Sequence, residues 1–291
     1  MTTPVTRLIL LLVVMCGCGI VLSLSGHFRT SIASGGASAV GSAQSPTVTR
    51  IKDPLAVEPW SVAVTFSEVL VTNYASDNVT IINRANNAIQ NIPVGDGPGG
   101  TADGPFGVAD GLSAIYVTLF GSNTIPSKGV PVDYSNIGPG RVQLLRKESD
   151  GTYRRLSQIG VGKGPRFPAI LLGRCKLYVP CGGSDRVDVI DTSRDQKIKE
   201  IPVGSDPSSC VLSIDESKLY VTNFGDGTVS VIDTKTDTKI KDIPAPRLVV
   251  GEAPMAQYPW RSAVSGSNGN LYVAYWGMTG GTGTGGAIVE I

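Results

Sequence analysis

The residues best suited to chemistry in this chain follow a proline that recurs five times. The prolines are Pro59, Pro105, Pro165, Pro207 and Pro259, and the residues after them are Trp60, Phe106, Arg166, Ser208 and Trp260, with Arg261 next to the last. Indole, phenyl and guanidinium groups stack well on a planar or sugar-like group, or on a peptide. If the five positions are equivalent in a symmetric fold, these side chains meet around one axis. We therefore predict a binding site of Trp60, Phe106, Arg166, Trp260 and Arg261; the alternative is that the rings fill a narrow channel.

Acid–base and metal chemistry have less support in the sequence. Glu58, Asp103 and Asp206 precede the recurring prolines or lie close to them, so a carboxylate site for a divalent metal is one arrangement that they allow. We expect them to cap turns instead. The only histidine, His27, lies outside the repeated region, which disfavours histidine-based acid–base catalysis. Because the common nucleophile, phosphate and zinc motifs are also missing from the sequence, we predict no catalytic residue, no metal and no cofactor.

The elements that carry these side chains are copies of one repeat. Residues 173–191 align without a gap on residues 215–233. Residues 67–83 are a third copy, and residues 113–120 and 269–276 begin two more. Repeats of about 40–50 residues that contain several short strands are typical of propeller blades.

Alternating hydrophobicity and turn residues divide one copy into four strands. We expect them at residues 208–214, 218–223, 228–233 and 238–243. A single sheet of this kind cannot bury both of its faces, so the copies must stack around an axis. The sequence therefore predicts an all-β fold, a β-propeller of four-stranded blades.

The five aligned prolines predict five blades. The last copy ends at residues 285–291, which match a third strand, so its fourth strand has to come from elsewhere. Residues 46–60 resemble the fourth strands of other copies. We therefore expect an N-terminal strand near residues 47–53 to pair with the last blade and close the ring, which removes exposed strand edges. A fragment of a seven-bladed ring is the alternative.

The long connections between the predicted strands all belong to one face. In an up-and-down blade, the loops between strands 2 and 3 and the loops between blades lie on the same side. Segments 121–140 and 277–286 are of the first kind, and segments 94–104 and 245–258 are of the second. A rigid scaffold often carries its function on such loops, so we predict binding through this long-loop face. The alternative is that long loops are merely tolerated there. The Gly–Thr-rich residues 280–286 are expected to be a flexible loop.

The first 46 residues are expected to lie outside the propeller. Arg7 precedes an uncharged apolar run at residues 8–25, typical of an export signal or of an N-terminal membrane anchor, with lipidation at Cys18 as a third alternative. Residues 26–46 have the composition of a flexible linker. The predicted domains are an export signal or anchor at 1–25, a linker at 26–46 and a propeller at 47–291. The protein is thus expected in the periplasm, at the cell surface or in the medium.

Charge and cysteine content limit the partners. With 25 Lys and Arg against 24 Asp and Glu, the formal net charge is +1, so no nucleic-acid surface is predicted. We expect a monomer that meets a membrane only through its N-terminal segment and binds an unidentified small molecule, glycan or protein. Cys181 and Cys210 are predicted on the same face; a disulfide between them is conceivable in an oxidising compartment, but we expect free buried thiols.

Short motifs in every copy resemble the YVTN-repeat β-propeller family, which is also described as YncE-like. The motifs are LVTN at 70–73, YVTL at 116–119, YVPC at 178–181, YVTN at 220–223 and YVAY at 272–275, with VSVIDT and KEIPVG elsewhere. The resemblance covers residues 47–291 and implies an exported or envelope-associated propeller. It implies little about activity, because the shared residues belong to the scaffold. Insertions in the second and fifth copies depart from the family pattern.

These features together predict an exported or envelope-associated binding or interaction module that uses the long-loop face around a central channel. The alternative is a propeller enzyme of lactonase or lyase type, with a carboxylate or metal site at the channel mouth.

Overall fold

The computed structural model describes most of the chain. The described residues are 11–16, 19–24, 47–51, 56, 58–96, 104–111, 114–121, 132–135, 137–244, 249–250, 253–254, 256–279 and 283–290. The predicted linker at 26–46, with His27, lies outside these residues, as do Cys18 and Asp103.

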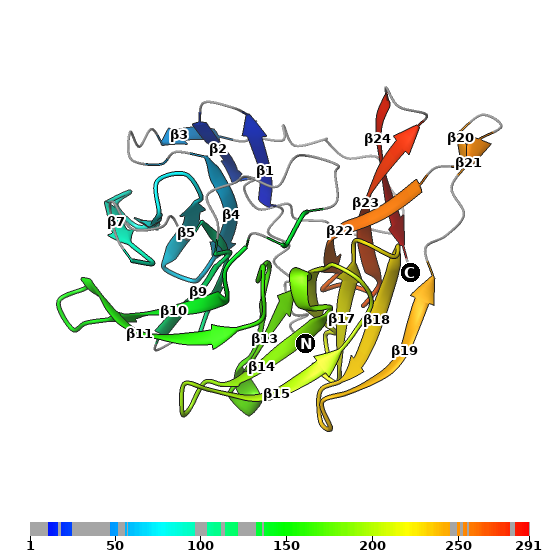
Figure 1. Ribbon diagram of the computed structural model, residues 1–291. Coiled ribbons are helices and arrows are strands. Elements are labelled where there is room, and N and C mark those ends of the chain that lie inside the picture. Colours follow the sequence, from blue (N-terminus) through cyan, green and yellow to red (C-terminus); the bar gives the residue numbers. More distant parts are fainter. Residues whose placement is uncertain are drawn as a thin grey trace, which may run out of the picture.

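Four copies of the repeat form four-stranded antiparallel sheets whose strands follow one another in chain order (Figure 1). The first sheet contains β4 (Pro59–Val64), β5 (Glu68–Asn73), β6 (Asn78–Asn83) and β7 (Ile89–Pro93). The second contains β8 (Pro105–Asp110), β9 (Ala114–Leu119), β10 (Gly140–Lys147) and β11 (Tyr153–Val161). The third contains β12 (Ala169–Leu171), β13 (Lys176–Cys181), β14 (Arg186–Asp191) and β15 (Gln196–Pro202). The fourth contains β16 (Pro207–Leu212), β17 (Lys218–Asn223), β18 (Thr228–Asp233) and β19 (Thr238–Pro244).

The fifth sheet has three strands in the described part of the chain: β22 (Ala256–Val264), β23 (Leu271–Thr279) and β24 (Gly283–Glu290). A short pair, β20 (Val249–Val250) and β21 (Ala253–Pro254), precedes it. The ladder of β23 and β24 continues to Thr279 opposite Gly283. The prediction of loops was therefore wrong for residues 256–258, 277–279 and 283–286, which extend β22, β23 and β24. The physical reason is that ladder hydrogen bonds satisfy the backbone polar groups of these residues.

The N-terminal strand does not close the fifth sheet. β3 (Thr47–Ile51) pairs with β2 (Gly19–Leu24), which pairs in turn with β1 (Leu11–Cys16). The prediction that residues 47–53 supply the last strand of the final blade was therefore wrong. The physical reason is competition between edges: the apolar, β-branched run at residues 11–24 forms a hairpin, and its free edge accepts the ladder bonds of β3.

The apolar N-terminal run forms strands in its described part. Among the described residues, a search for helices long and apolar enough to cross a membrane finds none. Export or anchoring by residues 1–25 stays a prediction from the sequence.

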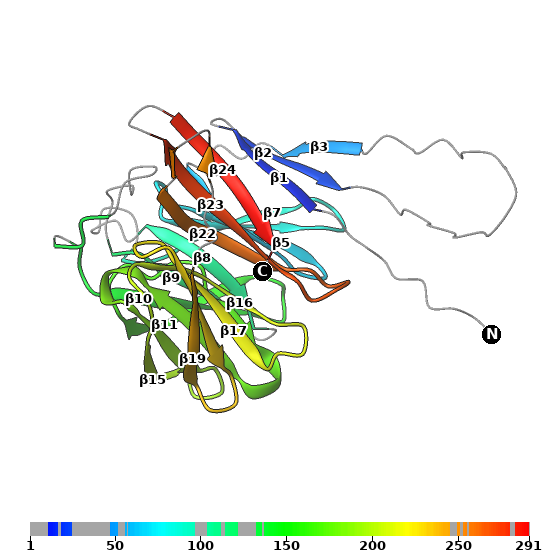
Figure 2. The same ribbon diagram turned by 90° about the vertical axis from the view of Figure 1, so that its right-hand side faces the viewer.

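The sheets surround a common centre, to which each presents its first strand. Contacts run from β4 to β8, from β8 to β12, from β12 to β16 and from β16 to β22, and Figures 1 and 2 show the sheets arranged around these strands. Apolar side chains of neighbouring sheets fill the spaces between them; Leu70 and Val79 of the first sheet pack with Val117 and Leu145 of the second. Apolar residues thus fill the interfaces between successive sheets, and the prediction of a β-propeller with four-stranded blades is confirmed.

A shared backbone feature places the residue that follows each proline. In four sheets the residue before the proline has a left-handed backbone conformation. Its carbonyl oxygen accepts a hydrogen bond from the backbone N–H of the residue that follows the second strand. Four first strands also have a register shift within three residues after the proline. Such bulges re-aim side chains. The four left-handed residues are Glu58 (φ 54°), Gly104 (51°), Gly164 (60°) and Asp206 (52°).

Candidate functional site

The threonine of the YVTN-like motif fixes the residue after the proline in the next sheet. Its hydroxyl donates a hydrogen bond to the carbonyl oxygen of that residue, so the motif has a physical role in orienting the predicted site. These bonds join Thr72 Oγ1 to Phe106 O (3.0 Å), Thr118 Oγ1 to Arg166 O (2.7 Å) and Thr222 Oγ1 to Trp260 O (3.5 Å). In the third sheet Pro180 occupies the threonine position, and Ser208 Oγ of the next sheet donates to Trp260 O at 2.8 Å.

The predicted aromatic residues meet at the centre of the sheets. The ring of Phe106 lies 5.0 Å from that of Trp60 and 6.4 Å from that of Trp260, measured between centroids. Phe106 is 0% exposed, whereas Trp60 and Trp260 are half-buried. The ring of Phe106 thus fills the centre, and the two indoles lie at its margin.

Sequence reasoning missed several members of this cluster. Phe167 lies between Phe106 (4.9 Å) and Trp260 (6.0 Å), and Tyr74 and Phe120 pack against the same rings. Tyr74 and Phe120 both follow a YVTN-like motif directly, so their shared position in the repeat was a signal that the sequence offered. The central aromatic cluster comprises Trp60, Tyr74, Phe106, Phe120, Phe167 and Trp260.

Arg166 is fully buried and forms an ion pair. Its Nη2 lies 3.0 Å from Asp206 Oδ1 and donates to the Tyr134 hydroxyl at 2.6 Å. The Tyr134 hydroxyl in turn donates to Asp206 Oδ1. The guanidinium carbon also lies 5.0 Å from the centre of the Trp260 ring, a cation–π contact. Asp206 and Tyr134 thus give the buried guanidinium an ionic partner and a hydrogen-bond acceptor.

Three polar atoms of this group have no hydrogen-bond partner among the described residues. They are Arg166 Nε, Arg166 Nη1 and Asp206 Oδ2. Buried polar groups are nearly always satisfied in native proteins, so such atoms indicate a place for water or for a bound group. The ion pair therefore keeps unused capacity for both donating and accepting hydrogen bonds.

Tyr134 comes from the long segment 121–140 and reaches the third sheet. It lies over Gly164, Gly182 and Gly183, where any Cβ would collide with its ring or hydroxyl. Gly182 stands where the other sheets have Tyr74, Phe120 and Phe224, so Tyr134 occupies the space of a missing aromatic residue. Burial, with Asp206 nearby, raises the pKa of Tyr134 well above its usual value, so the hydroxyl is a neutral donor. This contact brings one predicted long loop to the predicted site.

Arg261 is the second cation of the site. Its guanidinium carbon lies 3.6 Å from the centre of the Phe167 ring, and its side chain is half-buried. Within the described residues it makes no hydrogen bond through its side chain and no ion pair. Burial lowers the pKa of Arg261 to about 10, which leaves it protonated at neutral pH. Arg261 is therefore a partly desolvated cation with no carboxylate partner in the described part of the chain.

The carboxylates proposed for a metal do not converge in the described structure. Asp206 is buried against Arg166, Glu58 is exposed, and Asp103 lies outside the described residues. Searching the described part of the chain finds no group of three or more His, Cys, Asp or Glu residues placed to hold a metal. Cys181 and Cys210 are free buried thiols whose pKa values are raised by burial.

Comparison with known proteins bears on the fold. No family model and no curated protein matches the sequence. The structure matches a solved structure of virginiamycin B lyase from Staphylococcus aureus, a catalytically inactive histidine-to-alanine variant with quinupristin. The TM-score is 0.59 and the sequence identity is 15%; the match covers 98% of this chain and 87% of that one. The fold is a β-propeller.

Two further matches agree with the propeller fold. A protein of unknown function from Desulfotomaculum acetoxidans matches with a TM-score of 0.56 and 11% identity over 84% of this chain and 75% of that one. The dihydro-heme d1 dehydrogenase NirN, in complex with DHE, matches with a TM-score of 0.56 and 14% identity over 93% of this chain and 52% of that one. At these identities the likeness shows the fold alone, so membership of the YVTN-repeat family stays a prediction from the sequence motifs.

Proposed function

We propose that this protein is an exported or envelope-associated binding module that recognises a small organic anion with a planar group. The observation that carries the proposal is Arg261, a partly desolvated guanidinium stacked on Phe167 with no carboxylate partner among the described residues. An isolated cation in such a place is costly unless an anion compensates it. A carboxylate of the ligand would supply that charge and would accept a forked pair of hydrogen bonds.

The balance of charge at the site favours an anion over a cation. Asp206 is matched by Arg166, so Arg261 remains as the unmatched charge among the described residues at the centre. The Lys163 ammonium, 3.5 Å from the Tyr134 carbonyl oxygen, is offset by the nearby Asp185 carboxylate, which accepts the Asp206 N–H. A cationic ligand would meet repulsion from Arg261.

The indole rings give the ligand its planar surface. Trp60 and Trp260 are half-buried and keep surface that a ring can cover, whereas Phe106 and Arg166 are fully buried and support them. Aromatic residues at the centre of an interface often dominate its binding energy. The five predicted residues therefore divide into contacting groups (Trp60, Trp260, Arg261) and supporting groups (Phe106, Arg166).

A lyase-type enzyme is the second candidate, favoured by the fold neighbour virginiamycin B lyase. That neighbour is named as catalytically inactive when one histidine is replaced by alanine. The single histidine of this chain, His27, precedes the propeller region in sequence, so an equivalent reaction here would need a different acid–base group. Binding without turnover is the better account of the residues present.

The test is a titration of the full chain with 4-nitrobenzoate, followed by calorimetry and by quenching of tryptophan fluorescence. The neutral and cationic analogues 4-nitrobenzyl alcohol and 4-nitrobenzylamine are the comparison ligands. We expect the carboxylate to bind most tightly, Arg261→Gln to weaken it about tenfold, and replacement of both Trp60 and Trp260 by Ala to cost about 1–4 kcal/mol. Lys235→Ala, on the short-turn face, is the control. Equal affinity for the three probes, or a loss with Lys235→Ala, would contradict the proposal.

A further inference from the structure

The outer edge of the fifth sheet is unpaired in the described part of the chain. β24, the red strand in Figure 2, pairs with β23 from Gly283 opposite Thr279 to Glu290 opposite Tyr272. No described strand pairs with its other side, whereas the third strand of each other sheet has a fourth strand there. A free edge presents a row of N–H and C=O groups, which is a template for another strand.

β24 lacks the features that protect the outer edges of the other sheets. β11, β15 and β19 each carry two Lys or Arg residues and pair with a register shift, and β7 ends with Pro93. Charges, bulges and prolines of this kind prevent edge-to-edge pairing. β24 has no Lys, Arg or Pro, and its ladder with β23 has no register shift. Its sequence is therefore typical of an inner strand, which has a neighbour on both sides.

Ile288 of β24 occupies a position that is buried in the other sheets. The third residue of each YVTN-like motif pairs with Ile288 or with its equivalents, which are Val79, Val142, Val187 and Val229. These valines are 0% exposed, whereas Ile288 is 77% exposed. In the fourth strands each valine has an isoleucine opposite to it: Ile92, Ile159, Ile201 and Ile243. Since cross-strand pairs of this kind stabilise a sheet, the pattern predicts a β-branched residue opposite Ile288.

Glu290 gives the edge its charge. In the other sheets its position holds an apolar residue: Ile81, Leu144, Val189 and Val231. Opposite Val189 and Val231, the fourth strands have Lys199 and Lys241. Glu290 is exposed and accepts a hydrogen bond from Asn270 Nδ2, and it has no ion pair within the described residues. A lysine in the corresponding place of an added strand would therefore lie directly opposite a carboxylate.

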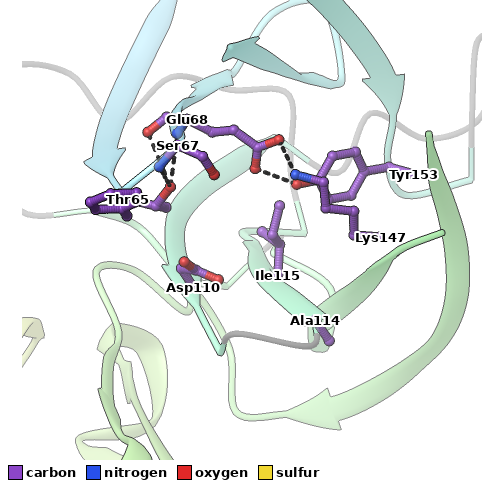
Figure 3. Close-up of a pocket in the computed structure, with 9 residues that line it drawn as sticks. Thr65, Ser67, Glu68, Asp110, Ala114, Ile115, Lys147 and Tyr153 are labelled. Carbon is purple, nitrogen blue, oxygen red and sulfur yellow. Dashed lines mark hydrogen bonds and ion pairs between the residues drawn. The ribbon is translucent and has the colours of Figure 1, made fainter. Parts of the chain in front are cut away.

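A lysine and a glutamate already join separate strands elsewhere in the molecule. Glu68 of β5 accepts a hydrogen bond from Lys147 Nζ of β10 at 2.6 Å, and the Tyr153 hydroxyl donates to the same carboxylate (Figure 3). The two strands belong to different sheets, so this pair holds separate elements together. Glu290 offers the same chemistry to a strand beside β24.

The residue between Ile288 and Glu290 distinguishes an added strand from the fourth strands of this chain. Its equivalents are polar and lie opposite polar residues: Thr80 opposite Asn91, Gln143 opposite Gln158, Asp188 opposite Glu200 and Ser230 opposite Asp242. The fifth sheet has Val289 instead. An apolar residue matches valine there, whereas the carboxylates of β15 and β19 do not. The edge is therefore unsuited to the fourth strand of a second copy.

We propose that the edge of β24 binds an extended segment of a partner protein, which adds to the fifth sheet as its fourth strand. Running antiparallel to β24, the segment has Lys or Arg opposite Glu290, an apolar residue opposite Val289 and a β-branched residue opposite Ile288. Its sequence thus reads basic–apolar–β-branched. Ladder hydrogen bonds hold the backbone, and the three side chains give specificity, as in other cases of strand addition.

The test measures binding of fluorescein-labelled peptides to the full chain by fluorescence anisotropy. TKIKVIP has the sequence of residues 238–244 with valine in place of Asp242, so that its second Lys comes opposite Glu290 and its second Ile opposite Ile288. We expect it to bind about threefold more tightly than TKIKDIP and than TKIEVIP, in which Glu replaces the second Lys. TKIKPIP should not bind, because proline in the middle of a strand removes a ladder bond.

Variants at exposed residues identify the edge. Glu290→Lys should reverse the charge preference, so that TKIEVIP binds more tightly than TKIKVIP, and Ile288→Ser should weaken TKIKVIP about threefold. Ile240→Ser is the matched control, because Ile240 is 53% exposed on β19. Arg261→Gln tests independence from the central site. Neither of these two changes should alter the affinity for TKIKVIP.

Four results would overturn the proposal: equal affinity for TKIKVIP and TKIEVIP, binding of TKIKPIP, a loss of affinity with Ile240→Ser, or no binding at millimolar peptide. A dimer of the full chain that Ile288→Ser dissociates, measured by sedimentation velocity, would also overturn it, because it would assign the edge to a second copy. The comparison of the peptides needs no variant, so it decides the matter if a variant does not fold.

Discussion

The contact between Tyr134 and Gly182 makes a quantitative prediction about how a long loop is attached to the sheets. In Gly182→Ala the new Cβ would lie 2.6 Å from Asp206 Oδ1 and closer still to the Tyr134 hydroxyl. Overpacking of this kind costs about 1–3 kcal/mol. Tyr134→Phe removes the hydroxyl that joins Arg166 to Asp206, and hydrogen bonds to charged groups contribute about 1.5–3 kcal/mol.

The double variant distinguishes this arrangement from two independent defects. Because the hydroxyl is the atom that the new methyl group meets, Tyr134→Phe relieves part of the collision in Gly182→Ala. We therefore expect the double variant to be more stable than the sum of the single changes predicts, with a coupling of about 1 kcal/mol or more.

Urea unfolding of the four proteins, followed by circular dichroism, measures this coupling. Gly160→Ala is the matched control, because no atom lies within 4 Å of the place its Cβ would take. Additivity within about 0.5 kcal/mol, or a Gly182→Ala variant as stable as Gly160→Ala, would refute the placement of Tyr134.

Three further predictions concern the N-terminal sheet, the tyrosines and export. Deleting residues 1–56 removes β1–β3, which pair only with one another among the described strands. The thermal midpoint of unfolding should therefore stay within about 3 °C of that of the full chain. A fall of more than about 10 °C would show that the ring needs β3. Burial raises the pKa of six tyrosines: Tyr74, Tyr116, Tyr134, Tyr153, Tyr178 and Tyr275. In the unfolded protein these tyrosines lose their protons near pH 10, whereas in the folded protein they keep them. The free energy of unfolding should therefore be unaffected by them below pH 10 and should fall above it. Phenolate absorbance at 295 nm should rise for these groups only as the protein unfolds, and ionisation of all nine tyrosines in the folded state would contradict this. Replacing Leu10–Val13 with charged residues should keep the protein in the cytoplasm of a bacterial host, and unchanged fractionation would mean that the apolar run is not an export signal.

The repeat was readable from the sequence because each strand follows a simple pattern. Alternating apolar residues and turn residues predicted strands at 218–223 and 228–233, and β17 and β18 have these bounds. The recurring proline predicted which side chains meet, because symmetry does not depend on the details of packing. The convergence of Trp60, Phe106 and Trp260 follows from that position alone.

What failed or was missed depends on competition and on contacts distant in sequence. β3 could pair either with β2 or with β24, and the amino-acid composition does not tell which of the two pairings is more stable. Tyr134 lies in an insertion that the first, third and fourth copies lack, so no repeat pattern identifies it. Its signal was indirect: Gly182 breaks the series of aromatic residues after the YVTN-like motif, and the missing volume had to be filled.

The central claim, that the centre of the long-loop face binds an organic anion, is tested most directly by locating the anion. A crystal structure of the full chain with 4-bromobenzoate would do so, because anomalous scattering marks the bromine independently of the rest of the density. The account predicts that the carboxylate lies against the Arg261 guanidinium, with the ring between Trp60 and Trp260. A bromine peak confined to the short-turn face, or no peak at saturating concentration, would contradict it.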